Sequence, residues 1–412
     1  MWGTLQLKHP HAFAWVDALS YVLLVLLSFL VTLPYYPFVA GSEVAGPLHV
    51  IIAGVFLLLF VLSQLDKPVF SSRIINVCWI LLGLVALSGL IVYAFFGNAG
   101  MKAEIRSVLI PLCALMVGWQ LKMDENRMIG LILVFTMEMI VVGVSLIFLQ
   151  GTGFSISETY FADQKNAVGP MIATAAVLCT GMAFGASGGK KTVMMIMGLL
   201  LAFFCVLMIL TIRARAALLA VVAVMALMFF QRYKNRYLLL SFWGAIILVV
   251  AVFLLLPQSI KHYVDQSLFA GFSGDITSGR SARNQQALQV LAENPLMGQL
   301  LNAREVGIVH NYPLIQVLNY GLLMAAPLMA LYFYLLFVDI KAMATKGIAA
   351  MQNVGFYAML VIFMVSMFEY SFPYGPGTTT VLNFVLFGVA LRNVEPRKET
   401  ASPEENGNVQ EG

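Results

Sequence analysis

Long apolar stretches separated by shorter polar segments make up most of the chain. Most of them match the roughly 20 residues that an α-helix needs to cross a lipid bilayer. They cover about 15–37, 47–64, 74–96, 106–121, 128–149, 168–187, 192–211, 215–230, 237–256, 312–338, 348–372 and 376–392. This pattern predicts an all-α polytopic integral membrane protein with about twelve transmembrane helices.

The composition supports the same class, because 60% of the residues are hydrophobic and 11% are charged, with a mean hydropathy of +0.88. The first apolar stretch is too long for the hydrophobic region of a signal peptide, and no cleavage pattern follows it. We therefore expect it to stay in the protein as a transmembrane helix. The four cysteines lie inside predicted spans without metal-ligand spacing. The sequence therefore indicates neither a disulfide nor a zinc site.

Basic residues indicate the orientation, because Lys and Arg are enriched in cytoplasmic loops. A cytoplasmic N-terminus places most of the 24 basic residues in cytoplasmic segments and puts both termini on that side. The basic residues that then fall outside are Lys102, Arg106, Lys165, Arg213, Arg215, Lys261, Arg280, Arg283 and Arg304. Five of the six arginines among them concentrate in two segments after residue 200, which a random distribution does not predict.

Arg213 and Arg215 lie between two long apolar stretches. A guanidinium group cannot be deprotonated in a protein and is costly to bury, so an arginine at the mouth of a span needs a partner. On the external side we expect that partner to be an anion.

The polar segment 257–311 is the longest gap between apolar stretches and the one place with room for a site. Within it, apolar positions at helical spacing predict a helix with Arg280 and Arg283 in its first turn, ending at Asn294-Pro295. Cations are unfavourable at the positive end of a helix unless an anion such as a phosphate lies there. The alternative is that both arginines simply reach into solvent, and the two interpretations are equally good here.

His310 comes just before the next apolar stretch, where Asn311 is the expected helix cap and Pro313 suits the first turn. A neutral imidazole at a membrane surface can accept the proton of a sugar hydroxyl, as a general base does. The alternative is a histidine that only caps or packs, but the nearby arginines favour the base. Lys165 and Asn166 add a weaker signal at the same external mouth.

Asp17, Glu138 and Glu369 are carboxylates within predicted spans. Charged groups at that depth are expensive and need partners. Each of the three either pairs with an arginine or relays protons, as in a transporter.

The arrangement of these residues resembles the bacterial O-antigen ligase and O-antigen polymerase family, which shares a ligase-related C-terminal region. The resemblance covers roughly residues 195–335. At two positions the chain departs from that pattern, because Ala214 stands where many relatives carry Ser or Thr, and Asn284 and Gln285 replace a bulky aromatic residue. The matching elements are Arg213-Ala214-Arg215-Ala216, Ser278-Gly279-Arg280, Asn294-Pro295-Leu296-Met297-Gly298 and His310-Asn311.

The resemblance implies transfer of a glycan from an undecaprenyl diphosphate carrier to an acceptor sugar hydroxyl. Arg215 and Arg280 would neutralise the charge that develops on the diphosphate, and His310 would accept the proton. Because the external segments contain no Asp-x-Asp pair, we expect transfer without metal or other cofactor. Attack of the hydroxyl from the side opposite the diphosphate would invert the anomeric configuration. Substrate-binding roles are expected for Arg213, Arg283, Arg304, Asn311 and Lys165.

Two activities in this family differ in the acceptor. A ligase transfers the glycan to lipid A core in lipopolysaccharide biosynthesis, and a polymerase transfers it to another carrier-linked repeat unit of a surface polysaccharide. The single strong histidine and the single loop region favour the ligase slightly. A transporter of an anionic lipid or metabolite is an alternative from another class, but it predicts an internal pseudo-symmetry that the sequence does not show.

We expect a protein of the bacterial inner membrane, whose partners include the lipid bilayer and no nucleic acid. Four regions are expected along the chain. They are N-terminal transmembrane helices at 1–194, a ligase-related core at 195–338 with the periplasmic loop 257–311 between the ninth and tenth spans, C-terminal transmembrane helices at 339–392, and a disordered cytoplasmic tail at 393–412.

Overall fold

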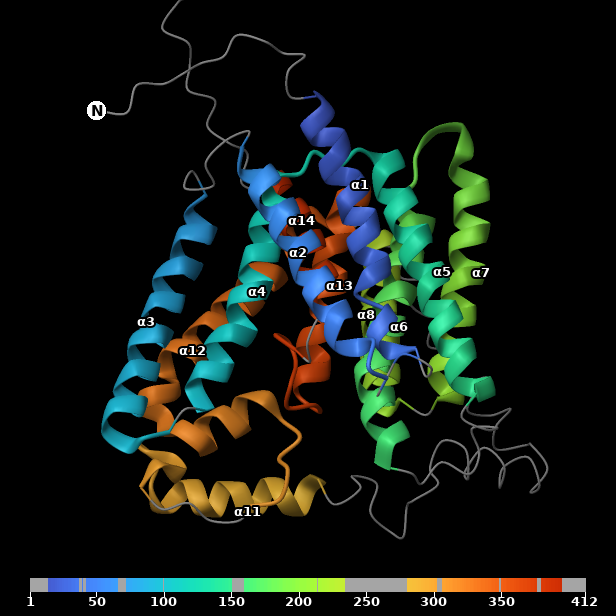
Figure 1. Cartoon of the computed structure of the whole chain (residues 1–412). Coiled ribbons are helices and arrows are strands. Elements are labelled where there is room, and N and C mark those ends of the chain that lie inside the picture. Colours follow the sequence, from blue (N-terminus) through green and yellow to red (C-terminus); the bar gives the residue numbers. More distant parts are fainter. Residues whose placement is uncertain are drawn as a thin grey trace, which may run out of the picture.

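The structure is a computed structural model, which describes residues 14–36, 39, 42–65, 72–98, 100–149, 159–212, 214–233, 280–301, 306–347, 350–375 and 379–394. Within these ranges the regular structure is helical throughout (Figure 1). Up to residue 233 the helices are α1 (Ala14–Leu30), η1 (Leu33–Tyr35), α2 (Ala45–Gln64), α3 (Arg73–Phe96), α4 (Gly100–Gln120), α5 (Glu125–Leu149), α6 (Thr159–Gly185), η3 (Gly188–Lys190), α7 (Lys191–Thr211) and α8 (Arg215–Arg232). From residue 280 they are α11 (Arg280–Glu293), η4 (Gly298–Leu300), α12 (Tyr312–Lys346), η5 (Met351–Asn353), α13 (Val354–Ser366) and α14 (Val381–Val394).

Eight described segments are long and apolar enough to cross a membrane, namely α1 with η1, α2, α3, α5, α6, α7, α8 and α12. The helices α13 and α14 are apolar but shorter. This composition of helices is that of a polytopic membrane protein. The predicted span at 237–256 lies outside the described residues.

Several helix ends differ from the hydropathy prediction. Because α6 already begins at Thr159, Lys165 and Asn166 lie inside the helix, and Asn166 is not its cap. A hydropathy pattern marks only the apolar part of a helix. It therefore misses polar residues at the start of the helix, such as those of α6. In the same way α14 continues to Val394, so the first two residues of the predicted tail are helical.

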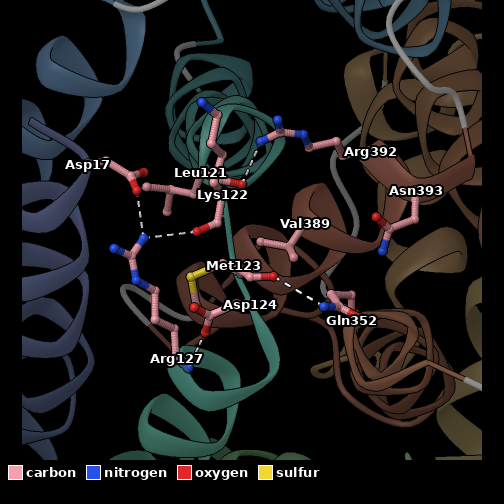
Figure 2. A pocket seen from close by; sticks show the side chains of 10 residues that line it. All are labelled: Asp17, Leu121, Lys122, Met123, Asp124, Arg127, Gln352, Val389, Arg392 and Asn393. Carbon is pink, nitrogen blue, oxygen red and sulfur yellow. Dashed lines mark hydrogen bonds and ion pairs between the residues drawn. The ribbon is translucent and has the colours of Figure 1, made fainter. Parts of the chain in front are cut away.

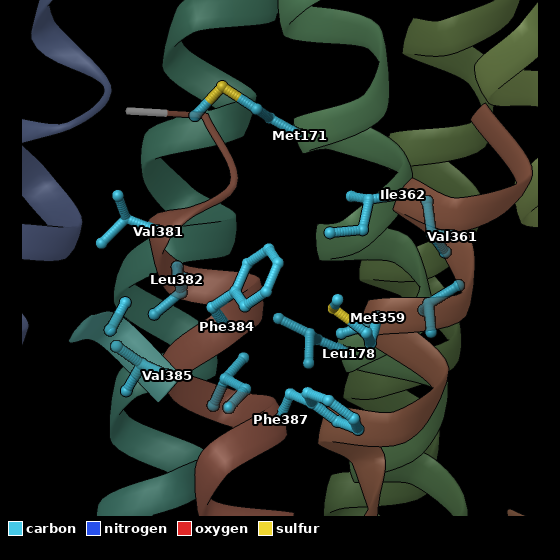
Figure 3. Packing of buried hydrophobic residues seen from close by; sticks show 14 of the residues in the cluster. Met171, Leu178, Met359, Val361, Ile362, Val381, Leu382, Phe384, Val385 and Phe387 are labelled. Atoms are coloured by element: carbon cyan, nitrogen blue, oxygen red, sulfur yellow. The ribbon is translucent and has the colours of Figure 1, made fainter. Parts of the chain in front are cut away.

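The helix α14 lies in the centre of the described bundle, and its residues from Val381 to Leu391 are buried. Glycines let neighbouring backbones come close, since a Cβ at Gly118 of α4 would overlap the Val385 carbonyl and one at Gly388 would overlap the Leu115 carbonyl. Such small-residue contacts are typical of helix packing in membranes. Figure 3 shows apolar side chains of α6, α13 and α14 filling the space between these helices.

Two ends of the bundle can be told apart in Figure 1. The helix α11 and the first part of α12 lie together across one end, and the first residues of α1 lie at the other. The predicted region boundaries at 194/195 and 338/339 fall inside α7 and α12, so they separate stretches of sequence within continuous helices.

Candidate functional site

The helix α11 begins at Arg280 and ends at Glu293, directly before Asn294-Pro295. Its spacing of apolar residues buries Ala287 against Val309 and Leu318, next to the start of α12. The Arg280 end of α11 therefore has a fixed position relative to α12.

A break in α12 strengthens this attachment. Gly321 has a backbone φ of 69° and ψ of 168°, so the helix changes direction there. The exposed N–H groups after the break are satisfied by the loop that follows α11, because Leu322 N donates to Pro295 O over 2.9 Å and Leu323 N donates to Leu296 O over 3.1 Å. The Pro295–Gly298 segment thus caps the second part of α12.

Glycine is required on both sides of this contact. A Cβ at Gly321 would overlap the Leu296 backbone, and a Cβ at Gly298 would overlap the Leu318 carbonyl. Both residues also have positive φ, which side chains other than glycine rarely tolerate. The Pro-x-x-Gly element of the sequence therefore joins α11 to α12.

Asn311 fixes the start of α12 as expected. Its Oδ1 accepts a hydrogen bond from Leu314 N over 2.9 Å, which is the N-cap contact. Its Nδ2 donates to Met367 O over 3.2 Å, in the turn after α13. His310 is therefore held beside the segment from Met367 to Tyr370.

Glu369 in that turn contacts both of the strongest candidates from the sequence. Its Oε1 lies 3.0 Å from Nη2 of Arg280, and its Oε2 lies 3.3 Å from Nδ1 of His310. Arg280 also donates through Nη1 to Phe368 O over 2.7 Å. The side chain of Glu369 is 6% exposed, that of His310 17% and that of Arg280 30%, so solvent reaches the two basic groups more easily than the carboxylate.

The carboxylate of Glu369 balances the positive charge of Arg280 at the start of α11. The sequence left two interpretations open, a phosphate beside the arginines or arginines that reach into solvent, whereas in the structure the carboxylate of Glu369 pairs with Arg280. A guanidinium has five N–H donors, and the contacts described use two of its nitrogens. Arg280 is therefore an anchored cation that keeps donors for a further anion.

The same contact selects a tautomer of His310. An ionised carboxylate can only accept hydrogen bonds, so Nδ1 of His310 carries the hydrogen that points to Glu369. In the neutral ring Nε2 then has a free lone pair. This arrangement suits a general base whose orientation is fixed by a carboxylate.

An exposed aromatic ring lies beside the histidine. Tyr370 is 46% exposed, and its ring centroid is 6.1 Å from that of His310 in an edge-to-face arrangement. Phe368 is also partly exposed in the same turn. The ring of Tyr370 thus places an exposed aromatic surface next to the proposed base.

Of the remaining predicted residues, the structure describes Lys165, Arg215 and Arg283. Arg215 is the half-exposed first residue of α8, and Ala214 before it packs on Gly169 of α6, a turn after the half-exposed Lys165. Arg283 is exposed and its side chain lies along the backbone of Gly307. Arg213 and Arg304 lie outside the described residues.

Two of the three carboxylates in predicted spans pair with an arginine. Glu369 pairs with Arg280, and Asp17 lies 2.7 Å from Arg127. Glu138 instead accepts hydrogen bonds from Tyr36 over 3.1 Å and from Thr32 over 3.5 Å. The charge of Glu369 within an apolar stretch predicted a partner, but nothing in the sequence indicated which arginine pairs with it.

Comparisons with known proteins do not name a family. No protein-family model matches the chain, and no curated protein matches it. In the described ranges no three His, Cys, Asp or Glu side chains are grouped so that they could hold a metal ion.

Proposed function

We propose that the chain is a membrane glycosyltransferase that moves a glycan from undecaprenyl diphosphate to a sugar hydroxyl on the periplasmic face. The observation that carries this proposal is the shared carboxylate. Glu369 contacts a cation, Arg280, through one carboxylate oxygen and a candidate base, His310, through the other. Glycosyl transfer from a diphosphate needs both groups at the same carbon atom.

On the donor side, the bond between the anomeric carbon and the diphosphate oxygen breaks, and its electron pair remains on the diphosphate. The developing negative charge requires fixed cations in a site of reduced dielectric. Arg280 supplies one, and Arg215 at the start of α8 supplies the second. Arginine is suited to this work because its planar donors meet phosphate oxygens in pairs.

On the acceptor side, the hydroxyl oxygen bonds to the anomeric carbon from the face opposite the diphosphate, which inverts the configuration. Nε2 of His310 accepts the hydroxyl proton as this bond forms. The imidazolium that results is stabilised by Glu369 through Nδ1. The proton then leaves to solvent when the product departs.

The lipid carrier is inferred from the resemblance of the 195–335 region to the O-antigen ligase and polymerase family. Asn311 directly follows the histidine, and the side chain of Arg283 lies beside Gly307, three residues before it. Both are assigned to substrate binding, as are Lys165, Arg213 and Arg304. The acceptor distinguishes two forms of the proposal. We favour lipid A core as the acceptor, which would make the protein a ligase. The alternative is a polymerase, whose acceptor is a carrier-linked repeat unit.

The test is product formation by the purified full chain with a carrier-linked glycan and either acceptor. Arg215→Ala, Arg280→Ala and His310→Ala, each alone, are expected to lower the rate roughly a hundredfold or more. Arg106→Ala is the control, because Arg106 is an exposed arginine of α4 outside the proposed site. Near-normal rates in all three site variants would contradict the proposal.

The acceptor is tested in cells. A deletion strain that accumulates carrier-linked polymer lacks a ligase, whereas one that makes single-repeat caps on lipid A core lacks a polymerase. These sugar products are separated by gel electrophoresis of the lipopolysaccharide. A deletion that leaves both products unchanged counts against either acceptor.

A further inference from the structure

A pocket of about 410 Å³ lies at the opposite end of the bundle from Glu369, between the ends of α1, α4, α5 and α14 (Figure 2). Its volume is within the range of small-molecule sites, which is roughly 300–1,000 Å³. The proposed transfer reaction uses none of its residues. The pocket therefore requires an explanation of its own.

The pocket is built on the segment 121–124 between α4 and α5, whose backbone is held by side chains from three other parts of the chain. Arg392 of α14 donates to Leu121 O over 2.9 Å and to Gln120 O over 3.1 Å. Arg127 of α5 donates to Lys122 O over 3.1 Å, and Gln352 of η5 donates to Met123 O over 3.2 Å. These bonds give the pocket a fixed shape.

The charge of the lining is positive. Lys122, Arg127 and Arg392 face two carboxylates, Asp17 and Asp124, which leaves a formal charge of +1. Both carboxylates already have partners, because Asp17 pairs with Arg127 over 2.7 Å and Asp124 caps α5 by accepting from Arg127 N over 2.7 Å. Figure 2 shows the guanidinium of Arg392 reaching from α14 to the backbone beside Leu121, next to the side chain of Lys122.

The position along the helices sets the depth of the pocket in the membrane. Asp17 lies near the start of the apolar span Trp15–Tyr35, and Arg127 lies near the start of the span Glu125–Phe148. The pocket is thus at the level where the hydrocarbon core gives way to lipid headgroups. Basic pockets between transmembrane helices at this level are suited to anionic lipid headgroups.

We propose that this pocket binds the phosphate group of an anionic phospholipid from the adjacent leaflet. Lys122 and Arg392 contact the phosphate, and the Asp17–Arg127 pair closes the far side. An anionic lipid is preferred over a zwitterionic one because its headgroup adds no amine to a lining that is already positive. The bound lipid joins α4, α5 and α14 and so stabilises the end of the bundle opposite the proposed catalytic site.

The test uses the purified full chain in a neutral detergent, titrated with phosphatidylglycerol or phosphatidylcholine, with bound lipid counted by native mass spectrometry. Lys122→Gln is expected to weaken phosphatidylglycerol binding roughly fivefold, since a surface cation contributes about that much to anionic lipid binding. Asn393→Trp fills the pocket without removing a charge and is expected to weaken binding at least as much. Lys346→Gln is the matched control, because Lys346 is an exposed lysine in the last turn of α12.

Binding of phosphatidylglycerol that is unchanged in both pocket variants overturns the proposal, as does equal binding of phosphatidylcholine by the unaltered chain. A third arm adds glycerol phosphate or inorganic phosphate in place of lipid and measures the unfolding temperature. If these soluble phosphates raise that temperature as much as phosphatidylglycerol does, the ligand is a soluble phosphate and the assignment to a lipid fails. The variants retain the Glu369 site, so transferase activity reports separately on the proposed function.

Discussion

Glu369 is a buried acid whose two oxygens are each used by a different side chain. Breaking such a contact by removing one partner is more costly than losing a surface ion pair, because the remaining charge is left poorly solvated. Arg280 is 30% exposed and can regain water, whereas Glu369 at 6% cannot. Of Glu369, Arg280 and His310, the carboxylate of Glu369 is therefore the charge that relies most on its two partners for stabilisation.

Glu369→Gln tests the orientation of the base. The amide keeps the shape of the side chain, but its NH₂ group can face Nδ1 of His310 and place the imidazole hydrogen on Nε2. We expect kcat for transfer to fall roughly a hundredfold while the protein remains folded. Glu369→Asp, which keeps the charge on a shorter side chain, should retain more activity than Glu369→Gln, and the reverse order would count against this role.

Tyr370 is expected to bind the acceptor sugar through its exposed ring beside His310. Tyr370→Ala should raise KM for the acceptor severalfold and change kcat little, because the ring binds the substrate in its ground and transition states alike. Tyr370→Phe keeps the ring and should behave like the unaltered enzyme. A loss confined to KM for the donor would instead assign the ring to the lipid-linked glycan.

Some residues of the site could be predicted from the chain and others could not. Arg280, His310 and Asn311 stand at helix starts, where capping rules and the helix dipole make a charged or polar residue informative. Glu369 is separated from Arg280 by 89 positions. A single sequence does not show that two residues so far apart in the chain are in contact. The backbone carbonyls of Met367 and Phe368 cannot be predicted as hydrogen-bond acceptors either, because every residue type has a backbone carbonyl.

At the scale of elements, the break at Gly321 divides one apolar stretch into two parts with different positions. Its first part lies beside α11 and carries the His310 end, while its second part enters the bundle. Hydropathy predicted the stretch but not the break, since a single glycine barely changes the average. The Pro-x-x-Gly element is visible in the sequence, but only the structure shows that it caps the second half of α12.

Gly321→Ala should destabilise the fold and displace His310. The positive φ alone costs about 1–3 kcal/mol for a residue with a side chain, and the added Cβ would also overlap the Leu296 backbone. The unfolding temperature in detergent should fall by several degrees and transfer activity should fall with it. Gly54→Ala is the control, because no atom lies within 4 Å of a Cβ at that position in α2; an equal loss in both would contradict the assignment to the break.

At the scale of the whole molecule, a small number of buried polar side chains fix how the helices of the core pack. Asn383 of α14 donates to Thr174 Oγ1 of α6 over 2.9 Å and to Ala358 O of α13 over 2.8 Å. Apolar contacts alone leave the rotation of a membrane helix weakly determined, since lipid is as apolar as the partner helix. The class of the protein was evident from hydropathy, but this arrangement of helices was not.

Asn383→Ala is expected to lower the free energy of unfolding by about 1 kcal/mol or somewhat more, as typical interhelical hydrogen bonds in membranes contribute. Thr174→Val removes one acceptor while it keeps the shape of the side chain. Unfolding of both single variants and the double variant gives the coupling between them. Full additivity would show that the hydrogen bond contributes nothing to the packing of α6 on α14.

The position of Glu369 after α13 has a consequence for the biosynthesis of the protein. A chain that enters the membrane from its N-terminus delivers Arg280 and His310 well before the carboxylate that holds them. Until α13 and the following turn are inserted, the imidazole has no fixed tautomer and the guanidinium has no anchor. Unfinished or prematurely ended chains therefore carry both candidate residues without their carboxylate partner, and the proposed transfer activity is expected to arise only near the end of translation.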